Sequence, residues 1–109
     1  MAYDEELAAR IRELVAGERN VSEMKMFGGL AFLVNGNMSV AASGRGGVLV
    51  RVDPGESDEL VRTTNAELME MRGRSMPGWL RVQPRDDDEV QTWVERGVAY
   101  ARSLPPKKT

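Results

Sequence analysis

Two glycine-rich stretches beside basic residues are the first candidates for chemistry in this sequence. Gly28-Gly29 closely follows Lys25, and Gly44-Arg45-Gly46-Gly47 surrounds an arginine. A phosphate loop requires the pattern Gly-x-x-x-x-Gly-Lys-Ser/Thr, and a dinucleotide loop requires Gly-x-Gly-x-x-Gly between a strand and a helix. Neither stretch has that spacing. We therefore expect Gly28-Gly29 to form a bulge or a close backbone approach within a strand, and the second stretch to form a hairpin turn.

Residues able to bind a metal or attack a substrate are few. The chain has no cysteine and no histidine, which excludes thiol and Ser-His catalysis and Cys/His zinc sites. The methionines suit a core of flexible side chains, with a soft-metal site or adaptable binding surface as the alternative. The acidic run 86–89 suits a helix start, with Mg²⁺ binding as its alternative. We expect no catalytic residues, no metal site and no cofactor.

Basic residues gather in the segments that the sequence predicts as strands. Between residues 24 and 52 and between 69 and 82, all charged residues are basic except one, Glu70. Because side chains alternate along a strand, most of these should point away from a face of methionine and valine that the helices cover. The predicted interaction face consists of Lys25, Leu49, Arg51, Arg72, Arg74, Trp79 and Arg81.

Arginine and tryptophan are enriched among the residues that dominate protein interfaces. The leading interpretation is therefore a non-enzymatic module that binds a protein partner, with a homodimer through the same open face also expected. A net charge of −2 argues against nucleic acid as a direct ligand. The alternatives are a small enzyme or ligand-binding domain whose arginines hold an anionic ligand, and a solvated face that only balances acidic helices.

The elements that must position this face follow from hydrophobic periodicity, capping residues and turn signals. We predict an α+β fold in the order α-β-β-β-α-β-β-α, a two-layer α/β sandwich whose antiparallel five-stranded sheet carries its helices on one face. Turns are expected at Asn35-Gly36, at Gly44–Gly47 and at Met76-Pro77-Gly78. The expected helices are 4–16, 54–63 and 86–104, and the expected strands are 24–34, 38–43, 48–52, 69–74 and 79–83.

The length of 109 residues is typical of one domain. We expect a single domain over 1–109, with an ordered core at about 4–104 and a short basic tail at 105–109. No apolar run approaches the roughly 20 residues that a membrane-spanning helix needs. We therefore expect a cytoplasmic protein with no membrane contact.

Three stretches together resemble the N-terminal domain of the TfoX/Sxy family. They are "KMFGGLAFLVNGNM" (25–38), "LVRVDP" (49–54) and "MRGRSMPGWLRV" (71–82). The resemblance implies a secretion-chaperone-like fold, no catalytic residues, and a role in regulating competence or transcription. Family members that regulate competence act with a cyclic-AMP-responsive activator and carry a second domain; we expect this chain to be the first domain alone. The structural motif of the resemblance is Met26, Phe27, Gly28, Gly29, Asn35, Gly36 and Asn37.

Overall fold

The computed structural model describes residues 3–26, 28–71 and 73–106. Within these ranges the fold is α+β, as predicted, with one antiparallel sheet in the strand order β1-β2-β3-β4-β6-β5. That sheet has six strands in the described part of the chain, so the prediction of five is wrong. The elements are α1 (Glu5–Val15), β1 (Val21–Met26), β2 (Gly29–Val34), β3 (Asn37–Ala42), β4 (Val48–Arg51), α2 (Pro54–Thr63), β5 (Glu67–Met71), β6 (Arg74–Val82) and α3 (Asp87–Ser103).

The additional strand comes from the segment 24–34, which the sequence predicted as one strand. β1 and β2 form a hairpin in which Met26 lies opposite Gly29. Gly28 has a φ of 76°, a conformation that glycine adopts without a steric penalty and that suits a tight turn. The predicted bulge is therefore wrong. The predicted close approach is confirmed at Gly29, where a β-carbon would collide with the carbonyl oxygen of Ala42.

The turn between β5 and β6 also differs from its prediction. Arg74 lies opposite Met71, so the chain reverses beside Gly73, which has a φ of 78°, and not at Met76-Pro77-Gly78. Residues 76–78 lie inside β6, at the point where the pairing with β5 shifts register. An irregular position tolerates proline because no ladder hydrogen bond needs its missing N–H.

Local capping and turn signals are confirmed elsewhere. The Asp53 carboxylate accepts the N–H group of Gly55 at the start of α2. Asn35 and Gly36 have φ angles of 53° and 80°, as a two-residue hairpin requires. Asn37 is buried and donates from Nδ2 to the Pro105 carbonyl at 3.0 Å, which ties the start of β3 to the end of α3.

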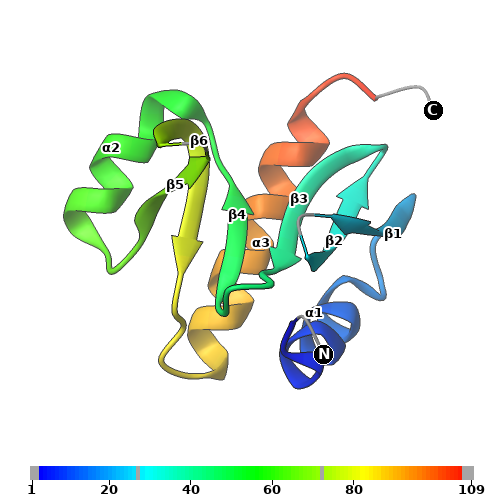
Figure 1. Ribbon diagram of the computed structural model, residues 1–109. Coiled ribbons are helices and arrows are strands. Elements are labelled where there is room, and N and C mark those ends of the chain that lie inside the picture. The colour runs from blue at the N-terminus through cyan, green and yellow to red at the C-terminus, as the bar shows by residue number, and fades with distance from the viewer. Residues whose placement is uncertain (1–2, 27, 72, 107–109) are drawn as a thin grey trace.

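The main core lies between the sheet and the helices. Figure 1 shows α3 behind the central strands, while the face turned toward the viewer carries no helix. α3 approaches β3 closely at Gly97, where a β-carbon would lie 2.6 Å from the Ser39 carbonyl oxygen. The strand residues of this helix-facing core are mostly β-branched or aromatic: Leu30, Phe32, Val34, Val40, Ala42, Val48, Val50, Leu80 and Val82.

A second, smaller cluster occupies the opposite side of the sheet, which we call the open face. Three of its members, Met26, Met38 and Met69, are methionines. The prediction that methionine and valine share one face and arginine the other is therefore wrong, because the valines face the helices and these methionines do not. The buried members are Ala31, Leu33, Met38, Ala41, Leu49 and Met69, with Met26 and Trp79 packed against them.

Candidate interaction surface

Strand pairing places four of the predicted interaction residues together on the open face. Leu49 lies opposite Arg81, and Arg51 lies opposite Trp79. Directly opposed residues of antiparallel strands share a face, and Leu49 belongs to the open-face cluster. Both arginines are half-buried, since their alkyl stems can cover apolar neighbours while the charged group stays accessible.

Arg51 is held between two aromatic rings from different elements. Its guanidinium carbon lies 5.5 Å from the centre of the Trp79 ring and 5.9 Å from that of Tyr100. β3 pairs with β4 only up to Val50, and Figure 1 shows the two strands diverging beyond that point with α3 behind them. Arg51 can thus contact a ring of α3 as well as one of the sheet. Cations are attracted to aromatic faces at such distances.

The arginines of the open face differ from those of the helix layer in their partners. Arg10 donates to both carboxylate oxygens of Asp87, at 2.6 and 2.8 Å, and so joins α1 to α3. Arg12 makes the same two-bond contact with Glu23. Within the ranges that the structure describes, Arg51 and Arg81 make no ion pair and no side-chain hydrogen bond. The other ion pairs are Arg85–Glu89, Arg96–Glu56 and Arg102–Glu18.

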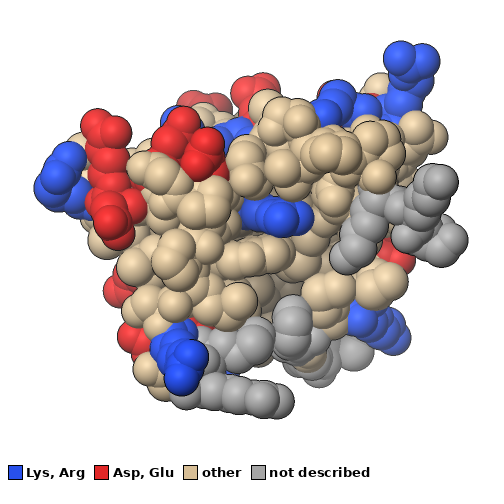
Figure 2. All heavy atoms as spheres, turned by 90° about the horizontal axis from the view of Figure 1, so that it is seen from above, with Lys and Arg blue, Asp and Glu red and all other residues tan. Residues whose placement is uncertain are grey.

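Two of these ion pairs lower the pKa of their acidic member. Hydrogen bonds from Arg12 lower the pKa of Glu23, and hydrogen bonds from Arg10 lower the pKa of Asp87. In Figure 2, acidic side chains gather over the side where α2 lies, and a basic side chain lies in the largely uncharged middle of the view. Some acids on the helix side are thus engaged by arginines, whereas Arg51 and Arg81 of the open face are in no ion pair among the described residues.

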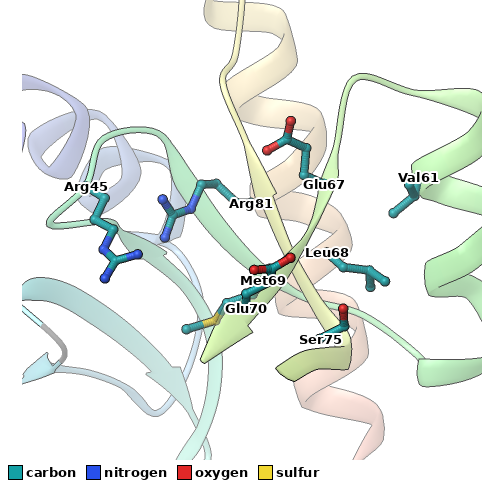
Figure 3. Close-up of a pocket in the computed structure, with 8 residues that line it drawn as sticks. All are labelled: Arg45, Val61, Glu67, Leu68, Met69, Glu70, Ser75 and Arg81. Carbon is teal, nitrogen blue, oxygen red and sulfur yellow. The ribbon is translucent and has the colours of Figure 1, made fainter. Parts of the chain in front are cut away.

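A hollow of about 570 Å³ lies beside β5 and β6. Figure 3 shows Arg45 and Arg81 extending from the β3–β4 turn and from β6 into the same side of this hollow. Two glutamates, Glu67 and Glu70, line it as well. Glu67 lies opposite Arg81, so the open face carries more negative charge than the sequence predicted. The remaining lining residues are Val61, Leu68, Met69 and Ser75.

Three predicted interaction residues are not part of this grouping. Lys25 lies opposite Leu30, whose side chain packs in the helix-facing core, so Lys25 points to the helix side and its predicted placement is wrong. Arg74 is exposed at the start of β6, beside the turn. Arg72 lies outside the described residues, as does Phe27 of the motif.

Sequence reasoning missed two residues of the site. Tyr100 was absent from the predicted face because its helix and the open face lie on opposite sides of the sheet. One signal could have found it: it follows Gly97 by almost one helical turn, and glycine in a buried helix stripe allows close approach to a strand. Arg45 belongs to a turn, where strand alternation says nothing about direction.

Other site types find no support among the described residues. There, no three acidic side chains cluster in a way that could hold a metal ion. Asp86 instead caps α3 by accepting the N–H of Glu89 at 2.9 Å. None of the described helices is both long and apolar enough to cross a membrane.

Comparison with known proteins identifies the family. No curated protein and no solved structure shows a significant match to the chain. The family model described as the TfoX N-terminal domain matches residues 13–101, a range that includes the whole sheet and most of α3. The chain belongs to the TfoX N-terminal domain family.

Proposed function

We propose that this chain is a non-enzymatic, cytoplasmic interaction module that works as a homodimer and binds a partner protein through the open face of its sheet. The observation that carries the proposal is the placement of Arg51 between Trp79 and Tyr100. An arginine fixed between two rings is oriented before a partner arrives. It therefore loses less side-chain entropy on binding than a free surface arginine would.

The charges indicate the chemistry of the partner. The guanidinium groups of Arg51 and Arg81 have no carboxylate partner among the described residues, and arginine binds carboxylates through two parallel hydrogen bonds. Trp79, which is only partly buried, supplies apolar surface next to them. The arrangement suits an acidic segment of a protein that also carries apolar side chains. The family resemblance favours a partner in the regulation of transcription or competence.

Charge reversal tests this proposal. The chain and its Arg51→Glu, Arg81→Glu and Arg62→Glu variants are immobilised, and proteins of the source cell that bind to each are identified. Arg62 is the matched control because it is an exposed arginine of α2, away from the open face. We expect a partner that the original chain and Arg62→Glu retain and that both open-face variants lose.

Titration of each variant with the purified partner then measures the loss of affinity. Interface arginines of this kind contribute about 2 kcal/mol or more to the free energy of binding. Each open-face variant should therefore raise the dissociation constant by about 30-fold. Equal affinity for all four proteins would overturn the proposal. Circular dichroism and thermal unfolding establish beforehand that each variant is folded.

A second candidate function is a domain that holds a small anionic ligand. The hollow lined by Arg45 and Arg81 favours it, but Glu67 and Glu70 line the same space and would repel an anion. Calorimetric titration with citrate and inorganic phosphate separates the two candidates. Saturable binding that Arg81→Glu abolishes would support the ligand domain, and the absence of binding would support the interaction module.

A further inference from the structure

β1 is an edge strand of the sheet in the described part of the chain, and the direction of each of its backbone N–H and C=O groups can be identified. Asn35 donates its N–H to the carbonyl of Asn20, and these two residues extend the register in which Val21 lies opposite Val34. Hydrogen-bonded and non-hydrogen-bonded pairs alternate along an antiparallel ladder. Met24 therefore directs its N–H and C=O groups toward β2, whereas Glu23 and Lys25 direct theirs to the open edge.

The side chains on this edge are self-complementary about Met24. Glu23 precedes it and Lys25 follows it, and both point to the helix side because they lie opposite Phe32 and Leu30. Met24 points to the other side and is 50% exposed, the one large apolar side chain among the described residues that is exposed to this degree.

We propose that β1 pairs antiparallel with β1 of a second copy of this chain, around a two-fold axis at Met24. In this register Glu23 of each copy exchanges backbone hydrogen bonds with Lys25 of the other, and the Lys25 side chain joins the existing Arg12–Glu23 ion pair of the other copy on the helix side. The two Met24 side chains meet on the open face. One sheet then runs through both copies. This proposal specifies the surface and the strand register of the homodimer proposed above. It therefore rests on the homodimer part of the proposed function.

The other edge of the sheet does not offer the same match. β5 carries the acids Glu67 and Glu70 and no basic residue, so pairing with its own copy brings only like charges to that edge. A lysine on an edge strand usually discourages pairing. Here the pairing that brings Lys25 to the seam places it opposite a glutamate that is ionised and whose side chain is 36% exposed.

Charge reversal at the seam tests the register. Lys25→Glu would place Glu23 opposite a glutamate, and Glu23→Lys would place Lys25 opposite a lysine. Sedimentation velocity should find the original chain dimeric and each variant monomeric. An equimolar mixture of the two variants should form a heterodimer, because each acidic pair then meets a basic pair. A monomeric original chain, variants that remain dimeric, or a mixture that stays monomeric would overturn the proposal.

A cross-link provides a second test that does not depend on charge. Met24→Cys places the only thiol of the chain on the proposed axis, in a non-hydrogen-bonded pair with a Cα separation of about 4.5 Å, which a disulfide can span. Ser22→Cys is the matched control because its two copies would lie about 13 Å apart along the seam. With oxidised glutathione, Met24→Cys should cross-link and Ser22→Cys should not. Equal yields would contradict this register.

The two proposals can fail separately. Arg51→Glu should leave the dimer intact while it abolishes partner capture, and Lys25→Glu should abolish the dimer without changing an arginine of the open face. Loss of the dimer in Arg51→Glu would place the contact between copies on the open face and overturn the β1 seam. Absence of any partner with an intact dimer would overturn only the partner contact.

Discussion

Gly97→Ala tests the close approach of α3 to the sheet, on which the position of Tyr100 depends. A β-carbon at this residue would lie 2.6 Å from the carbonyl oxygen of Ser39 and 2.6 Å from Cγ1 of Val40. Carbon–oxygen contacts are normally no shorter than about 3.3 Å, so α3 or β3 must move by about 0.7 Å. The oxygen belongs to the backbone of a buried strand and cannot rotate away.

Two effects of opposite sign decide the outcome. Overpacking of this kind costs about 1–3 kcal/mol, whereas alanine is better than glycine inside a helix by about 1 kcal/mol. We expect the packing cost to exceed the gain, so that Gly97→Ala lowers the free energy of unfolding by up to about 2 kcal/mol. Urea unfolding followed by circular dichroism measures it, since small single domains usually unfold in one step.

Ala99→Gly provides the control, because Ala99 is exposed on the same helix. It should lose about 1 kcal/mol through helix propensity alone. If packing at residue 97 were loose, Gly97→Ala would instead gain about the amount that Ala99→Gly loses. That result would refute the close approach and, with it, the argument that α3 carries Tyr100 to Arg51.

Two further predictions concern the ion pair between α1 and α3 and a buried serine of β3. Asp87→Asn should destabilise the chain at neutral pH, because Asp87 has a pKa below its usual 3.8 owing to Arg10. A carboxyl group whose pKa is lowered by folding contributes stability above its pKa in the unfolded chain, and this contribution is lost as the pH falls through its pKa in the folded chain. The difference in free energy of unfolding between the variant and the original chain, measured with urea, should therefore shrink below about pH 4. A difference that stays constant with pH would exclude this ion pair as its cause. Ser39→Ala removes a fully buried hydroxyl that donates to the Phe32 carbonyl at 2.8 Å and should cost about 1–2 kcal/mol; an unchanged free energy of unfolding would contradict that.

Local chemistry made much of the fold predictable. Asn35-Gly36 and the capping residues Asp53 and Asp86 act through their own neighbours, and the structure confirms them. Glycine turns were harder because one residue type suits several conformations. Gly28 fits a bulge or a turn equally well, and the choice between Gly73 and Gly78 as the β5–β6 turn depends on how far β6 must extend to pair with β4.

The site was predictable only along single strands. Alternation correctly put Leu49 with Arg51, and Trp79 with Arg81, on common sides of their strands. Alternation within one strand does not indicate which of its two sides the helices cover. The strand that contains Lys25 was therefore assigned the wrong orientation, and Lys25 was placed on the wrong face. The contact between Arg51 and Tyr100 joins a strand to a helix through the divergence of β3 and β4. Such a contact follows from tertiary packing and leaves no periodic signal.

The exposure of Trp79 during partner binding tests the central claim most directly. Hydroxyl radicals oxidise accessible tryptophan and methionine side chains, and mass spectrometry locates the products. With a partner that the Arg51→Glu variant fails to bind, oxidation of Trp79 should fall at saturation. Met24, on the β1 edge, should be oxidised equally with and without the partner. Unchanged oxidation of Trp79 in the saturated complex would contradict binding through the open face.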